Sequence, residues 1–270
     1  MGVRECSSGV AKGSIEANVR VSIITAVYNR AATIGDTLES VLSQDYPDIE
    51  HILIDGMSND GTEEMIRRYA GRIAVSVREP DTGIYNALNK GVRLATGQVI
   101  GFLHADDVYA DTGVVSRVVE GIEGLGGDGL TGVYGDLQYV QMGDTSKLVR
   151  HWKSGEYRQD RFRWGWMPAH PTVYLRRECY ERLGGFREDF QIAADYELMV
   201  RMLGVGGVRM GYIPRVMVKM RVGGKSNATL RNRLVANRED ERAWRVNGVR
   251  PPWGLRWLKP MRKLMQYVVR

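Results

Sequence analysis

The sequence predicts an α/β fold, with a mostly parallel, doubly wound sheet in the first half that continues into a second half of α+β character. The first observation is that short apolar runs alternate four times with segments of helical spacing over residues 19–105. Such alternation is typical of β-α-β units, whose strands are parallel. The second is that the alternation stops after residue 107, although neither a linker nor an internal repeat marks a separate domain.

The first half begins with a β-branched, apolar run over 19–26, which predicts a buried strand. A helix follows from Ile34 and should end near Pro47, because the residue before a proline leaves the α region. The next elements expected are strands over 51–54, 73–77 and 99–103, a helix starting near Glu63, and a helix over 84–95. That last helix should bury Ile84, Ala87, Leu88, Gly91 and Ala95, with Asn86, Lys90 and Arg93 on its opposite side.

The second half is predicted from weaker patterns. We expect a helix around 114–122, a strand over 133–140, an aromatic and basic stretch, a strand over 172–175, and helices over 177–183 and 194–203. The predicted organisation is a flexible tail over 1–18, one catalytic domain over 19–222 and a basic, aromatic-rich helical extension over 223–270. The domain would divide into halves of 19–107 and 108–222.

The net charge of +6 and the pI of about 9.3 suit nucleic acid, an anionic membrane surface or anionic substrates as partners. No DNA- or RNA-binding motif is recognisable, so we expect no nucleic-acid partner. The first 18 residues contain no apolar segment typical of a signal peptide, and no apolar run of 18 residues predicts a membrane span. Two distant cysteines favour a reducing compartment. These features predict a cytoplasmic location.

The acidic pair Asp106-Asp107 lies just beyond the apolar run over 99–103, after His104 and Ala105. Ligands of α/β sheets bind at strand ends, and two adjacent carboxylates would repel each other there unless a cation neutralised them. The pair therefore indicates a divalent metal, which would also carry phosphates. The alternative is a solvated loop that happens to hold two acids.

Other strand ends also carry residues suited to ligands. Tyr28 follows the first strand and could stack on a base, or it is a surface tyrosine in a turn. Asp55 ends the second strand and could accept a hydrogen bond from a base or a ribose hydroxyl. Lys90 and Arg93 could face a diphosphate, or could lie on a solvated helix face.

Two residues of the second half are candidates for chemistry. Asp195 follows a small apolar run and is expected to be half buried, which suits a general base, although a helix N-cap explains it equally well. His170 lies between prolines and could reach the metal, a phosphate or the acceptor, or be a structural histidine in a rigid turn.

Taken together, seven segments resemble the inverting family 2 glycosyltransferases with a GT-A fold. They are VSIITAVYNR, LIDGMSNDGT, EPDTGIYNALNKG, GFLHADD, AHPTVYLRR, GGFRED and ADYELMVR. The resemblance covers residues 19–203 and extends weakly through 223–226. It is strongest to bacterial enzymes of exopolysaccharide and lipopolysaccharide assembly, the colanic-acid type among them.

The resemblance implies a GT-A fold and a transfer of sugar from a UDP- or GDP-sugar to a hydroxyl of a glycan or lipid-linked acceptor, with Mn²⁺ or Mg²⁺. The implied donor-side residues are Thr25, Ala26, Tyr28, Asp55, Asp81, Lys90 and Asp106. Asp107 would bind the metal, with Asp106 on the metal or the ribose, and Asp195 would be the general base. His170 and Trp166 are assigned to the acceptor or phosphate side. The alternative is a catalytically silent sugar-nucleotide or glycan-binding module.

Two positions depart from the family pattern. Many relatives carry a second acid at the end of the second strand, where this chain has Gly56. Because that acid often contacts uracil, the choice between UDP and GDP stays open. The segment His104-Ala105-Asp106-Asp107 also has two acids where some relatives have three.

The end of the chain is basic and aromatic. No acidic residue follows Glu241, whereas arginines and lysines alternate with Trp244, Trp253, Trp257 and Tyr267. Basic charge with interfacial aromatics predicts a segment lying on an anionic membrane, here at the inner face of the plasma membrane. The alternative is a helix packed on the catalytic domain with a solvated basic face.

Overall fold

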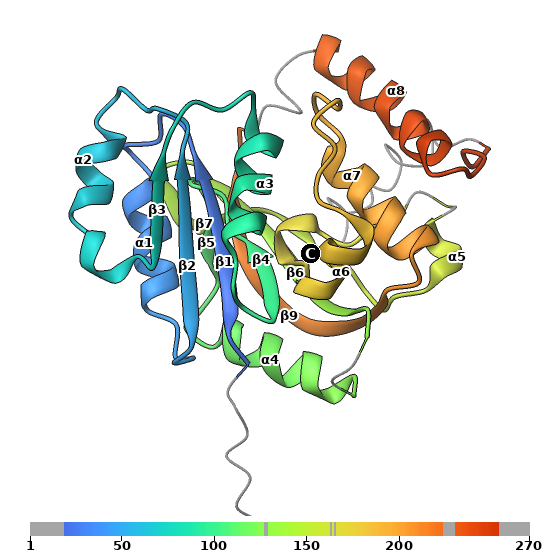
Figure 1. The fold of residues 1–270 in the computed structure, drawn as a ribbon, viewed down its shortest axis with the longest axis horizontal. Coiled ribbons are helices and arrows are strands. Elements are labelled where there is room, and N and C mark those ends of the chain that lie inside the picture. The colour runs from blue at the N-terminus through green and yellow to red at the C-terminus, as the bar shows by residue number, and fades with distance from the viewer. Residues whose placement is uncertain (1–18, 127–128, 163, 165, 224–229, 254–270) are drawn as a thin grey trace, which may run out of the picture.

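The computed structural model describes residues 19–126, 129–162, 164, 166–223 and 230–253, and the predicted tail over 1–18 lies outside them. Within these ranges, nine strands form one sheet in the order β3-β2-β1-β4-β8-β6-β9-β5, with β7 paired to β6 (Figure 1). The first four strands are parallel, β8 is antiparallel to both neighbours, and β6 and β9 are parallel. The predicted α/β class with a mostly parallel sheet is confirmed.

The first half follows the predicted alternation closely. Its strands are β1 (Val21–Val27), β2 (Ile49–Asp55), β3 (Val75–Arg78) and β4 (Val99–Phe102), and its helices are α1 (Ile34–Leu42), α2 (Thr62–Arg67) and α3 (Ile84–Leu94), with a short 3₁₀ turn at Ala70–Arg72. Ala87, Leu88 and Gly91 of α3 are buried as predicted. Ile84, the first residue of α3, is exposed instead.

The second half contains β5 (Val108–Tyr109), α4 (Val114–Gly124), β6 (Thr131–Gln141), β7 (Asp144–Trp152), α5 (Gln159–Phe162), a 3₁₀ turn at His170–Thr172, β8 (Tyr174–Arg176), α6 (Arg177–Leu183), α7 (Ala194–Met199) and β9 (Arg209–Arg221). The expected helix over 194–203 is α7 continued by a π-helical segment, Val200–Val205. Strands β5, β7 and β9 were not predicted. Pro214 interrupts the pattern of β9 and lies where its pairing with β6 shifts register.

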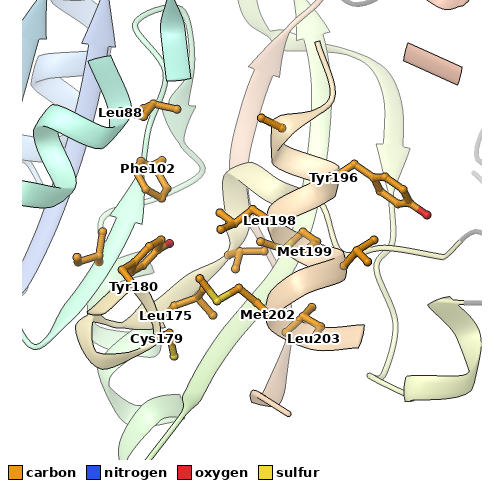
Figure 2. Close-up of a cluster of buried hydrophobic side chains, with 14 of the residues drawn as sticks. Leu88, Phe102, Leu175, Cys179, Tyr180, Tyr196, Leu198, Met199, Met202 and Leu203 are labelled. Carbon is orange, nitrogen blue, oxygen red and sulfur yellow. The ribbon is translucent and has the colours of Figure 1, made fainter. Parts of the chain in front are cut away.

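The sheet separates two main cores. Adjacent residues of β1 point to opposite faces, so Ile24 joins a core formed with α3, α6 and α7, whereas Ile23 joins one formed with α4. Figure 2 shows the first core, where Leu88 of α3 and Phe102 of β4 face side chains of α6 and α7. A Cβ on Gly91 would lie 2.3 Å from Cγ2 of Ile24, so the glycine lets α3 approach β1 closely.

The predicted extension over 223–270 is described in part. Helix α8 (Leu230–Val246) packs beside α7, as Figure 1 shows and as the hydrogen bond from Trp244 Nε1 to Tyr196 Oη confirms. This part of the extension therefore matches the packed alternative, whereas residues 254–270 lie outside the described residues. No helix in the described ranges is long and apolar enough to cross a membrane.

Candidate active site

The carboxyl ends of the parallel strands meet at one edge of the sheet. Val27 pairs with Asp55 across β1 and β2, and Ile24 pairs with Phe102 across β1 and β4. The segments that follow β1, β2 and β4 therefore start from the same edge, as the sequence predicted from strand ends alone.

Asp107 is 1% exposed and lies in the turn directly after β4. Its Oδ1 accepts a hydrogen bond from the backbone N–H of Arg221 at 3.2 Å, and the backbone of Asp107 is bonded to His104 and Thr37. Its Oδ2 has no hydrogen-bond partner among the described residues. Burial, and next the charge of Asp106, raise the pKa of Asp107 well above its ordinary value.

These residues fit a hard divalent cation. A buried carboxylate oxygen without a partner is costly, and a cation beside it would remove that cost. The described residues contain no group of three or more acids, histidines or cysteines able to hold a metal. Asp107, with Asp106, would therefore hold Mn²⁺ or Mg²⁺ only if a ligand such as a diphosphate supplied further oxygens.

Asp106 is partly exposed, and its Oδ2 lies 3.7 Å from Nε of Arg30. Its backbone carbonyl accepts a hydrogen bond from the buried Arg221, whose guanidinium also bonds Met142 O and Asp36. Arg221 thus fastens the acidic turn to the end of β9. Sequence reasoning missed Arg221 because β9 itself was not predicted.

Asp55 is almost fully buried at the end of β2 and is engaged internally. Its Oδ1 accepts hydrogen bonds from Ser58 N at 3.0 Å and Ser58 Oγ at 2.6 Å, and its Oδ2 lies 3.2 Å from Nε of Arg78. Ser58 Oγ in turn accepts a hydrogen bond from Asn29 N. In this structure Asp55 therefore shapes the loop beside the turn that carries Tyr28.

Asp81 fills the space beside Gly56. A Cβ at Gly56 would lie 2.8 Å from Oδ2 of Asp81 and 3.6 Å from Cδ2 of Tyr28, so these two side chains flank the glycine. Tyr28 is 59% exposed, whereas Asp81 is held by Lys90 Nζ at 2.7 Å. A carboxylate thus lies beside Gly56, the position at which the resemblance led us to expect a second acid.

Lys90 was expected to face a diphosphate or solvent, but it is paired with Asp81 and Glu79 at 2.7 and 2.8 Å. Desolvation opposes its charge, yet the hydrogen bonds to these two acids outweigh it and raise the pKa of Lys90. A diphosphate would have to compete with both carboxylates. The role that the structure shows for Lys90 is to orient Asp81.

The side chains of Thr25, Ala26 and Trp166, which we predicted to contact ligands, are all buried. Thr25 is fully buried, and its hydroxyl is hydrogen bonded to His51 Nε2 at 3.0 Å. Ala26 is also buried. Trp166 is 6% exposed, donates from Nε1 to Ser154 O and packs on Phe162, so its side chain belongs to the core. The aromatic pattern did not distinguish core from surface here.

Asp195 lies in the first turn of α7, and its side chain is 25% exposed. Its Oδ2 is 3.2 Å from Nδ1 of His170, so the two candidates of the second half form one pair. The His170 ring also makes an edge contact with the ring of His104, with centroids 5.8 Å apart. Burial, and next the neighbouring His170, lower the pKa of His104 to about 4. A partly exposed carboxylate with one histidine partner can accept a proton from a hydroxyl.

Comparison with known proteins identifies the family of the chain. The chain matches the family model described as Glycosyl transferase family 2 over residues 22–184. It is 32% identical over 183 residues to a PGL/p-HBAD biosynthesis glycosyltransferase of Mycobacterium bovis, with 67% of this chain and 68% of that protein covered.

Two solved structures share the fold. One is S. aureus TarS 1-349 in complex with UDP-GlcNAc, with a TM-score of 0.65, 15% identity, and coverage of 84% of this chain but only 65% of that one. The other is the mannosyltransferase PcManGT from Pyrobaculum calidifontis in complex with GDP-Man and Mn²⁺, with a TM-score of 0.60, 23% identity, and coverage of 92% and 69%. These likenesses support the GT-A fold. Together with the family match, they show that the chain belongs to glycosyl transferase family 2 and is a glycosyltransferase.

Proposed function

We propose that this protein is a metal-dependent, inverting glycosyltransferase that moves a sugar from a nucleoside-diphosphate sugar to a hydroxyl of a glycan or lipid-linked acceptor in bacterial surface polysaccharide synthesis. The observation that carries the proposal is the buried Asp107, whose Oδ2 has no partner among the described residues. A partly exposed acid, Asp195, complements it with a histidine partner. Asp107 is suited to bind a cation, and Asp195 is suited to accept a proton.

The proposed reaction is one displacement at the anomeric carbon. Oxygen of the acceptor hydroxyl bonds to that carbon, the bond to the diphosphate oxygen breaks, and the hydroxyl proton passes to Asp195. His170 Nδ1 lies 3.2 Å from Oδ2 of Asp195, and a protonated Nδ1 would orient the carboxylate. When bound at Asp107 and Asp106, the metal would neutralise the charge of the leaving diphosphate. A single displacement with one base and no carboxylate nucleophile inverts the anomeric configuration.

The nucleoside would lie over the turn that carries Tyr28. Its exposed ring suits stacking on a base, and the adjacent Asp81 presents a carboxylate to base or ribose donors. Asp55 supports this place through Ser58 and Asn29. The two structural neighbours are complexes with UDP-GlcNAc and with GDP-Man, which supports a nucleoside-diphosphate donor of either kind.

The test is turnover with a panel of UDP- and GDP-sugars, with and without Mn²⁺, followed by nucleotide release and thermal melting. We expect one donor both to raise the melting temperature in a metal-dependent way and to release its nucleoside diphosphate. Full turnover in excess chelator would refute the metal role. Donor binding without turnover against any glycan or lipid-linked acceptor would favour the silent binding module.

A membrane surface is the proposed place of action, at the inner face of the plasma membrane. The support is the run of basic and aromatic residues after Glu241 and the 97% exposure of Trp253, the last described residue. The full chain should co-sediment with anionic vesicles at low salt and be released at high salt. A version ending at Gly248 keeps α8 and should bind vesicles much less; equal sedimentation of both forms would count against the proposal.

A further inference from the structure

Glu239 of α8 is 8% exposed, and its carboxylate accepts three backbone hydrogen bonds from one short segment. Gln191 N donates to Oε1 at 2.7 Å, and Ile192 N and Ala193 N donate to Oε2 at 2.9 and 2.8 Å. These three residues directly precede α7, so the carboxylate reaches the chain two residues before Asp195.

The same segment, residues 191–193, is also fastened from the donor half. Tyr85 of α3 donates from its hydroxyl to the carbonyl of Ile192 at 2.6 Å. Burial, and next the charge of Asp195, raise the pKa of Tyr85 above its ordinary value, so Tyr85 keeps its hydroxyl proton for this bond. Glu239 therefore accepts from the backbone N–H groups of residues 191–193, and Tyr85 donates to a backbone carbonyl of the same residues. The stretch belongs to no strand or helix that would satisfy these polar groups.

Helix α8 and Asn247, the residue directly after it, also contact the residues that follow Asp195. Trp244 Nε1 donates to Tyr196 Oη, and Asn247 Nδ2 donates to Glu197 Oε1, each at 3.0 Å. Figure 2 shows the Tyr196 ring on the side of α7 away from Leu88 and Phe102, and Figure 1 shows α8 beside α7. Helix α8 therefore contacts the chain both before and after Asp195, whereas the Asp195 carboxylate itself is paired with His170.

We propose that α8 is part of the active-site framework and that Glu239 is a positioning residue for the base. This inference rests on the proposed role of Asp195. The oxygens of Glu239 are taken up by backbone N–H groups, so it acts through the segment and not on a substrate. A base must lie within hydrogen-bond reach of the hydroxyl it deprotonates, and a shift of about 1 Å can cost about 10²-fold in rate.

The test compares Glu239→Ala with Glu239→Gln in the full chain. The glutamine keeps one oxygen for Ile192 and Ala193 but sets an amide N–H₂ against the N–H of Gln191, so it should fall between wild type and alanine. We expect Glu239→Ala to lower kcat by about 10–100-fold and Glu239→Gln by about 3–10-fold, while donor affinity changes less than about twofold. Unchanged kcat in both folded variants would overturn the inference.

The variant Val118→Ala in α4 is the control for a decrease in kcat that arises from lost stability alone. Val118 is fully buried in the other core, on the opposite face of the sheet, so its truncation should lower the melting temperature without altering kcat of the folded protein. If Val118→Ala, at a matched melting temperature, lowered kcat as much as the Glu239 variants do, the effect would be general and the inference would fail. Glu239→Gln is nearly isosteric and keeps the test usable if the alanine variant does not fold.

A double-mutant cycle separates the inference from the proposed function. If Glu239 acts through the base, Glu239→Ala should cost less than about threefold in kcat when Asp195→Asn is already present. The full loss in both backgrounds would overturn the positioning role. Unchanged turnover in Asp195→Asn alone would instead overturn the base assignment, and with it the foundation of the inference.

Discussion

The two central acids of the site differ in burial and in what holds them. Asp107, in the donor half, is buried in the segment after β4 and closes a turn on His104 three residues before it, and the backbone N–H of Arg221 in β9 bonds its carboxylate. Asp195, in the acceptor half, is partly exposed, and its partner and supports come from His170, from Tyr85 and from Glu239, all distant in sequence. The difference teaches that a strand end can bring a buried ligand for a cation to the right edge of the sheet, where one distant strand secures it, whereas the base depends throughout on elements that converge only in the fold.

The largest effect is expected from the buried acid. Asp107→Asn keeps the shape but removes the charge, so activity should fall by at least about 10⁴-fold, because the amide is a weak ligand for a hard cation and no group of three or more ligands among the described residues could replace Asp107. Melting curves with Mn²⁺ and nucleoside diphosphate provide a second readout, since the metal-dependent part of the stabilisation should vanish. Metal-dependent stabilisation equal to that of wild type would break the contrast drawn above.

The exposed acid should respond differently. Asp195→Asn removes the proton acceptor, so kcat should fall by about 10²–10⁴-fold while the affinity for donor nucleotide is retained. Steady-state kinetics beside calorimetric nucleotide binding measure both. A collapse of nucleotide affinity instead would make Asp195 a binding residue.

Substitution of His170, the partner of Asp195, tests the same role of the base and should have a smaller effect. His170→Leu removes the Nδ1 atom that lies 3.2 Å from Asp195 Oδ2 and should lower kcat by about 10-fold, the value expected for one charge-assisted hydrogen bond. His170→Asn places an amide donor near the position of Nδ1 and should recover most of this loss. Equal kcat for the two variants would mean that the ring, not its hydrogen bond, is what matters.

In the donor half, the pair formed by Gly56 and Asp81 should control nucleotide affinity. Asp81→Asn removes the charge beside Tyr28, and Gly56→Ala adds a Cβ that would lie 2.8 Å from Asp81 Oδ2. Each should weaken binding of the free nucleoside diphosphate by about 10-fold, because both displace or weaken one hydrogen-bonding carboxylate. Calorimetry measures the affinity for the nucleoside diphosphate, and unchanged affinity in both variants would remove Asp81 from the donor site.

The smallest and most local prediction concerns stability. Burial lowers the pKa of His51 to about 4 from its ordinary 6.5. Between these two pH values, His51 is therefore protonated in the unfolded chain but neutral in the folded chain. The contribution of neutral His51 is complete above pH 6.5 and is lost as the pH falls toward 4, by up to roughly 3 kcal/mol. Denaturant unfolding at pH 7 and pH 5 should therefore show a smaller decrease for His51→Gln than for wild type; parallel decreases would contradict this.

Several features were predictable from the sequence because their causes are local. The apolar runs that became β1, β2 and β4 are buried on both faces, so their patterns identify them, and parallel strands necessarily bring their carboxyl ends to one edge. The positions of Asp55 and of Asp107 follow from this rule. Seven short motifs predicted the family, which the comparison confirmed over residues 22–184.

Other features were decided by the tertiary structure. Strands β7 and β9 have exposed and mixed patterns, so their pairing with β6, not their own periodicity, defines them. Trp166 became a core residue through its bond to Ser154. The pairing of Asp195 with His170, and the hold of Glu239 on residues 191–193, join segments 25 and about 46 residues apart. Such contacts stabilise the fold only after distant elements have packed, and no local pattern in the chain records which of them will meet.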